Sequence, residues 1–151
     1  YFYVDRPFAH DYSPTRGGSV TALYSLIDAH SVHDAAAENL ILDGNWPAET
    51  NNLTGCRGSG VFLIESHGIS VKNIEVHHFH GDAIGAQQCT DITISQCFVH
   101  HNSGGGLHPG SGSVRYFLQN NTIEDNGGCG IFYCLRTTHS LCEKNAISRN
   151  G

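Results

Sequence analysis

Short runs of alternating apolar and polar residues return at a fixed interval through the last ninety residues of the chain. Four segments align with one another: 60–82, 83–105, 106–129 and 130–151. One apolar phase, at intervals of 23, 24 and 24 residues, holds Val71, Ile94, Leu118 and Cys142. A second phase with the same intervals holds Val76, Val99, Ile123 and Ile147. A repeat of this length predicts a solenoid, because each unit can bury its apolar side only against its neighbours.

The period inside each unit is that of a β-strand. Apolar residues occupy every second position, as at Ile69 and Val71, and β-branched residues dominate these positions. Residues 60–151 nowhere sustain helical spacing for three turns. Glycine and asparagine close each unit, where a tight coil needs positive φ. We therefore predict an all-β parallel β-helix with about 23–24 residues and three short strands per coil.

The expected strands form three stacked rows, and asparagines mark the corners between them. The first row comprises 61–63, 84–86, 107 and 131–133. The second comprises 69–71, 92–94, 116–118 and 140–142, and the third 74–76, 97–99, 121–123 and 145–147. Two columns of stacked side-chain amides are predicted, Asn121 with Asn145, and Asn102 with Asn126 and Asn150.

The rest of the chain is less regular. Residues 1–38 are predicted to form one or more irregular N-terminal coils, and 39–151 the β-helix, with a polar loop insertion at 46–59. A stack of about five coils leaves apolar core and unpaired strand edges open at both ends. We therefore expect a fragment of a longer solenoid, with further coils or capping elements outside this chain.

The motif NLILDGN (39–45) and the degenerate repeats that follow it resemble the right-handed parallel β-helix proteins of the pectin-lyase-like superfamily, over about residues 39–151. The strings GAQQC (85–89) and GLHPGSGS (106–113) resemble uncharacterised bacterial β-helix repeat proteins. The superfamily includes polysaccharide lyases, glycoside hydrolases, uronan epimerases, phage tailspikes and adhesins, so the resemblance implies a fold and a glycan partner but no single reaction. The acidic clusters and signatures of the polygalacturonases, calcium-dependent pectate lyases and uronan epimerases are missing.

Charge and composition narrow the partners. The net charge is −6 and the eight Lys and Arg residues are scattered, which argues against a nucleic acid partner. No apolar run approaches the roughly 18 residues that span a membrane, and we expect a secreted or cell-surface protein. The six cysteines lack paired C-x-x-C spacing, and the stacked pairs His77-His78 and His100-His101 are expected to be solvated. We therefore predict no metal site, and no cofactor is indicated.

The outer face of the first row is the predicted site. Phe62, His108 and Phe132 are expected to point outward, so that the two aromatic rings present a surface on which a sugar stacks. The bend HPGSGS (108–113) breaks the repeat, and a histidine there is suited to general acid–base chemistry. The candidate catalytic residues are His108, Glu65, Arg136 and Tyr133. The candidate substrate-binding residues are Phe62, Gln87, Gln88, Ser111 and Phe132.

Two functions are consistent with the predicted fold and candidate site. The first is an extracellular carbohydrate-active protein that binds a polysaccharide along the first row, with cleavage or epimerisation near His108 left open. The second is a non-catalytic surface, adhesin or filament module that uses the solenoid as a scaffold or glycan-binding face. Whether the chain is an enzyme stays open at this point.

Overall fold

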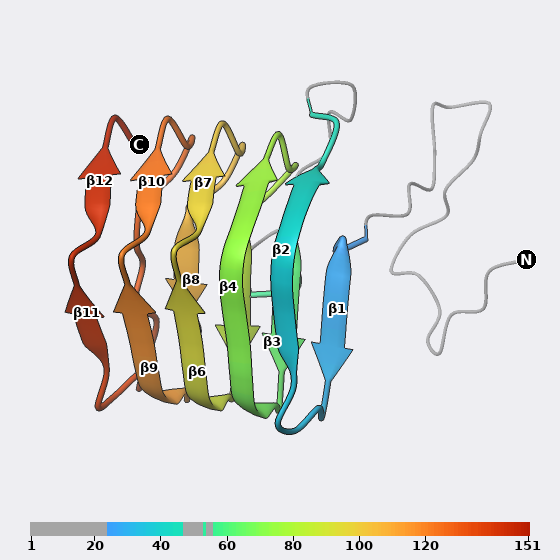
Figure 1. Ribbon diagram of the computed structural model, residues 1–151, viewed down its shortest axis with the longest axis vertical. Coiled ribbons are helices and arrows are strands. Elements are labelled where there is room, and N and C mark those ends of the chain that lie inside the picture. Colours follow the sequence, from blue (N-terminus) through green and yellow to red (C-terminus); the bar gives the residue numbers. More distant parts are fainter. Residues whose placement is uncertain (1–23, 47–52, 54–55) are drawn as a thin grey trace, which may run out of the picture.

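The computed structural model describes residues 24–46, 53 and 56–151, which form a stack of parallel strands (Figure 1). The first sheet contains β1 (Ile27–His30), β3 (Val61–Ile64), β5 (Ile84–Gln87) and β8 (Leu107–Pro109). The second sheet contains β2 (Ala36–Asp43), β4 (His67–His77), β6 (Thr90–Ser95), β7 (Phe98–His100), β9 (Val114–Gln119), β10 (Thr122–Glu124), β11 (Leu141–Glu143) and β12 (Ala146–Ser148). Within the described residues, no helix has the length and apolarity that a membrane crossing requires.

Strand pairing confirms the predicted parallel solenoid. The first sheet has the order β1-β3-β5-β8, and the second has the order β11-β9-β6-β4-β7-β10-β12, with β2 paired to β4. Val71, Ile94, Leu118 and Cys142 are register partners in consecutive coils, as are Val76, Val99, Ile123 and Ile147. The repeat read from the sequence is therefore the register of the sheets.

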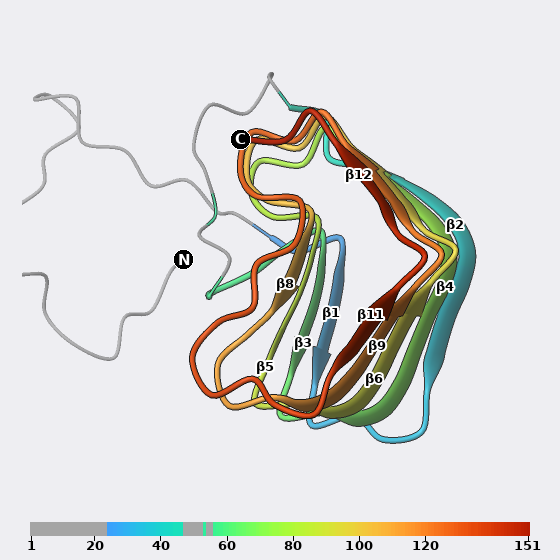
Figure 2. The same ribbon diagram turned by 90° about the vertical axis from the view of Figure 1, so that its left-hand side faces the viewer.

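The coils differ from the predicted three strands in two places. Strands β2 and β4 run without interruption through the corner of the second sheet, where Asn39 and Asn73 take positive φ angles of 59° and 51°. Figure 2 shows this corner as the sharp bend between β11 and β12. In the last coil the first row is reduced to a single bridge between Leu107 and Ile131. The stack also begins before residue 39, because β1 and β2 already pair with β3 and β4.

Apolar side chains from all three rows fill the inside of the coils. The fully buried set includes Val61, Val71, Ile74, Val76, Ile84, Ile92, Ile94, Leu107, Leu118 and Ile123. Burying each such side chain contributes about 1.5–3 kcal/mol, so this column dominates the stability of the stack. Cys142 and Ile147 continue the same columns but are exposed, because no described coil covers them.

Both predicted asparagine columns are present and bond to backbone as well as to each other. The Asn102 Nδ2 donates to Asn126 Oδ1 at 2.8 Å, and Asn126 Nδ2 donates to Asn150 Oδ1 at 2.8 Å. In the second column Asn121 Nδ2 donates to Asn145 Oδ1 at 2.9 Å. Each side-chain oxygen also accepts a backbone N–H from the coil before it. The columns thus satisfy backbone groups at corners that the sheets leave unpaired.

Ion pairs join neighbouring coils at the exposed corners. Arg115 binds both carboxylate oxygens of Asp91, at 2.6 Å each. One coil further along, Arg149 binds Asp125 at 2.7 Å and Glu124 at 2.8 Å. Each pair therefore links one coil to the next.

Candidate functional site

The outer side of the first sheet carries two hollows, one lined by residues of the bend that follows β8 and the other by residues of β8 itself. The first, with a volume of about 430 Å³, is lined by Cys56, Ile64, Gln87, Gln88, Ser111, Gly112, Leu135 and Arg136. The second, with a volume of about 310 Å³, is lined by Asp82, Gly104, Gly105, Leu107, His108, Gly128, Cys129 and Phe132. We call the first hollow the outer groove. The predicted surface for ligand binding is therefore concave rather than flat.

Asp82 and His108 form a hydrogen-bonded pair in the wall of the second hollow. His108, on β8, is only 6% exposed, and its Nδ1 lies 2.7 Å from Oδ2 of Asp82. The other oxygen of Asp82 accepts the backbone N–H of Gly105 at 2.6 Å. Burial opposes ionisation of Asp82, but the hydrogen bonds from His108 and Gly105 outweigh it and lower the pKa of the carboxyl group. Burial likewise opposes the charged form of His108, but the contacts with Asp82 and Cys134 raise the pKa of the ring above its ordinary value.

The pairing with Asp82 fixes the tautomer of His108. Since Asp82 accepts the proton on Nδ1, the neutral ring carries its lone pair on Nε2. This Nε2 atom is buried and has no hydrogen-bond partner among the described residues. A buried polar atom without a partner calls for an explanation, and an acceptor of this kind can take a proton or bind a metal.

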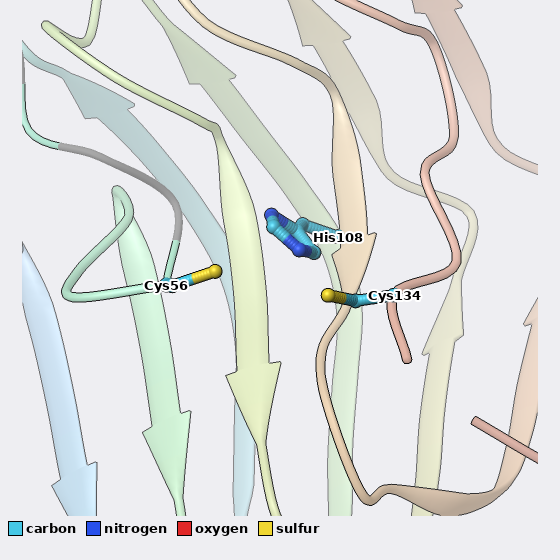
Figure 3. A group of neighbouring side chains, drawn as sticks. All are labelled: Cys56, His108 and Cys134. Atoms are coloured by element: carbon cyan, nitrogen blue, oxygen red, sulfur yellow. The ribbon is translucent and has the colours of Figure 1, made fainter. Parts of the chain in front are cut away.

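Two thiols lie beside the ring. Cys56, Cys134 and His108 each place a ligand atom within 4.8 Å of the other two (Figure 3). The Sγ atom of Cys134 also lies 3.1 Å from the hydroxyl of Ser111. The hydroxyl of Ser111 and the neighbouring ring of His108 lower the pKa of Cys134 to about 7, below the ordinary value of a thiol. Burial raises the pKa of Cys56, and the neighbouring Cys134 adds to the effect.

Four of the predicted residues meet in the outer groove. Gln87 is buried, its Oε1 accepts the backbone N–H of Ser111 at 2.9 Å, and its Nε2 has no partner among the described residues. Gln88, Ser111 and Arg136 line the same groove. Gln87, on β5, thus bonds to the bend at 108–113 through the N–H of Ser111, while His108 lines the second hollow.

The predicted aromatic surface is only half present. Phe132 is 49% exposed and contacts the His108 ring edge-on, with centroids 5.0 Å apart. Phe62 is 5% exposed, so the prediction that it lies open to solvent is wrong. The ring centroids of Phe62 and His30, on the neighbouring strand β1, lie 6.4 Å apart, and β5 pairs with β3 on the other side. Alternation predicts which way the side chain of Phe62 points, but not that its neighbours shield it from solvent.

The other candidate partners of His108 lie elsewhere. Glu65 is exposed at a corner and lines neither hollow. Tyr133, which alternation directs inward, points to Cys142 in the last coil, and burial raises its pKa to about 12. Arg136 lines the outer groove, whereas His108 lines the second hollow. The residues that the structure places against His108 are instead Asp82 and Cys134, and sequence reasoning had assigned neither as its partner.

The histidine pairs stack as predicted. The rings of His77 and His100 stack at 5.3 Å, and those of His78 and His101 at 5.7 Å. Alternation predicts that one member of each pair lies inward or in the turn, and His78 and His101 do lie in the turns after β4 and β7, with positive φ angles of 50° and 53°. Within each pair the two Nδ1 atoms bond to each other, at 2.7 Å and 2.8 Å. Asp43 lies near the first pair.

Comparison with known proteins supports the architecture. The family described as right handed beta helix region matches residues 39–151, which is most of the chain. The chain belongs to this family, and the right-handed parallel β-helix predicted from the repeat is confirmed. No curated protein and no solved structure matches the chain.

Proposed function

We propose that this protein is an extracellular carbohydrate-active β-helix protein, which binds a polysaccharide along the outer face of the first sheet and cleaves or epimerises it beside His108. The observation that carries the proposal is the Asp82–His108 pair in the wall of the second hollow, where Nε2 of His108 has no hydrogen-bond partner among the described residues. Pairs of this kind serve to place and withdraw a proton.

The outer groove offers the contacts that a sugar chain needs. Gln87 Nε2 is an unused donor, and Gln88 and Ser111 supply further polar groups for hydroxyls. Phe132 presents an exposed ring beside His108, and an aromatic face packs against the apolar face of a sugar. Arg136 supplies the one cationic side chain among the residues described as lining the groove, which favours a polymer bearing carboxylates. This local charge opposes the net charge of −6 on the whole chain.

The chemistry follows from the fixed tautomer. Asp82 holds the Nδ1 proton and stabilises the imidazolium that forms when Nε2 accepts a proton. In an elimination, the proton on the carbon next to the uronate carboxyl moves to Nε2, a carbon–carbon double bond forms, and the bond to the glycosidic oxygen breaks. The leaving oxygen takes up a proton from solvent, and the imidazolium later returns its own proton to solvent. In an epimerisation, the carbanion is reprotonated on its opposite face instead. Arg136 stabilises the carboxylate charge in both reactions.

A panel of neutral and uronate-containing polysaccharides tests the proposal, assayed for binding, new reducing ends, unsaturated uronates and solvent hydrogen exchange at the uronate C5. We expect turnover of at least one polymer, reduced by about 10²–10⁴-fold in His108→Ala. Asp82→Asn should lower turnover while binding is retained, and His139→Ala, an exposed histidine outside both hollows, is the control.

Binding without turnover, unchanged by His108→Ala, would instead identify a non-catalytic glycan-binding module. The regular stack, with its asparagine columns, is a rigid scaffold suited to that role. Absence of binding to every polymer would reject the carbohydrate proposal as a whole.

A further inference from the structure

The two thiols and the ring of His108 converge from three separate parts of the chain. Cys56 comes from a turn in the insertion, His108 from β8, and Cys134 from the segment that follows Ile131 in the last coil (Figure 3). Their ligand atoms lie within 4.8 Å of one another. Sequence spacing argues against zinc, but spacing rules apply to ligands from one loop, whereas stacking joins these three from different coils.

We propose that Cys56, His108 and Cys134 form a binding site for a thiophilic transition metal such as zinc. Two thiolate sulfurs and one imidazole nitrogen suit Zn²⁺, which prefers sulfur and nitrogen ligands in a tetrahedral arrangement. Three protein ligands leave the fourth position open. Because Cys56 also lines the outer groove, a ligand there has access to that position.

The surroundings of His108 are those of a metal ligand. A ligating histidine commonly donates its other ring N–H to a carboxylate, which fixes the tautomer and raises the basicity of the ligating nitrogen. Asp82 occupies this place at 2.7 Å from Nδ1, and the remaining Nε2 is buried without a partner among the described residues. A bound metal would satisfy that nitrogen, which otherwise costs about 1–3 kcal/mol of folding free energy.

The three ligand atoms already lie near the separation that a bound metal needs. Bond lengths of about 2.0–2.3 Å to zinc place tetrahedral ligand atoms about 3.3–3.8 Å apart, so the cluster needs to contract by at most about 1–1.5 Å. Cys56 is exposed and lies in a turn, where a movement of this size is inexpensive.

Neither the other cluster nor a disulfide accounts for these observations as well. In the group formed by Asp43, His77 and His78, the two Nδ1 atoms are bonded to each other at 2.7 Å. A disulfide between Cys56 and Cys134 would use the two sulfurs but leave Nε2 of His108 without a partner. Only a metal engages all three groups.

The inference goes beyond the proposed function and has readouts of its own. The reduced, chelator-treated protein is titrated with Co²⁺ and followed by sulfur-to-cobalt charge-transfer absorption, and zinc affinity is then measured by competition and calorimetry. We expect one metal per chain and thiolate bands. Cys56→Ser, Cys134→Ser and His108→Ala should each weaken binding by at least about 100-fold, and Asp82→Asn by about 10–100-fold. Cys142→Ser is the matched control, because Cys142 is a free exposed thiol away from the cluster.

Circular dichroism of each variant establishes that the fold is retained before affinities are compared. Equal affinity in the wild type and Cys56→Ser, or no thiolate band in the reduced wild type, would overturn the inference. So would a Cys56–Cys134 disulfide that persists in mild reductant. Glycan turnover measured in chelator tests the proposed function separately, so the failure of one proposal is distinguishable from the failure of the other.

Discussion

Replacing Asn102 by alanine should destabilise the protein far more than the same change at Asn150, at the end of the same column. Asn102 is 2% exposed. Its Oδ1 accepts the N–H of Phe79 at 3.0 Å, and its Nδ2 donates to the carbonyl of Val76 at 3.1 Å and to Asn126 Oδ1 at 2.8 Å. The truncation leaves the Phe79 N–H buried and unpaired, because Phe79 itself is fully buried.

The magnitude follows from these bonds. One unsatisfied buried donor costs about 1–3 kcal/mol, and the two bonds lost from Nδ2 add about 1 kcal/mol each, so we expect a loss of about 3–5 kcal/mol for Asn102→Ala. Asn150 makes equivalent bonds, including acceptance of the Asn126 N–H at 3.1 Å, but it is only partly buried, so water replaces much of what is lost. We expect about 1–2 kcal/mol there, so the two unfolding constants differ by about 10–100-fold.

Urea denaturation of the two variants and the wild type measures this difference. Circular dichroism follows the sheets. Fluorescence follows Trp46, the only tryptophan, which lines one hollow with Asn102. Coincident transitions by the two probes establish that the coils unfold together. Equal losses in both variants, or a loss below about 1 kcal/mol for Asn102→Ala, would refute the view that the buried column holds the corners together.

Three further results are expected. The rate of alkylation of Cys134 in the metal-free protein should rise with pH through about 7, because the thiolate is the form that reacts. Cys97, whose pKa is raised by burial, should stay protected, and peptide mass spectrometry distinguishes the two residues. A rise centred near the ordinary thiol pKa would contradict the lowered pKa of Cys134. Gly110→Ala would press a methyl group against β5 and the Gln87 amide, so it should weaken glycan binding and lower the free energy of unfolding by about 1–3 kcal/mol, as checked by calorimetry and denaturation. Stoichiometric zinc should suppress glycan turnover reversibly, since the metal occupies the nitrogen that His108 uses as a base; turnover that is unchanged when binding is saturated would show that the two roles are separate.

The repeating part of the molecule was predictable because stacking turns sequence periodicity directly into register. Val71 and Ile94 are one period apart in the chain and adjacent in space, and the same holds for Asn102 and Asn126. A residue that recurs in phase contacts its counterpart whatever the details of the coil. For this reason the rows and the asparagine columns followed from the spacing alone.

The site was harder to predict from the sequence because its residues do not recur at the repeat interval. Asp82 lies at a corner between two units and reaches His108 from 26 positions away, while Cys56 belongs to the insertion. Alternation says which way a side chain points but not what covers that face, and so it misplaced Phe62. One signal in the sequence pointed to Asp82. It follows a glycine at the end of the unit 60–82, and His108 lies near the start of the unit 106–129.

The exposed ion pairs bear on how the chain folds rather than on how stable it becomes. Coils with nearly equal apolar columns can mispair by a whole coil with little loss of burial, which would trap the nascent stack in the wrong order. Omitting one coil would set Arg115 beside Gly68 instead of Asp91, since these residues occupy equivalent corners. The charges thus distinguish each coil from its neighbours, and the ion pairs of Arg115 and Arg149 favour the native order of the coils over an order shifted by one coil.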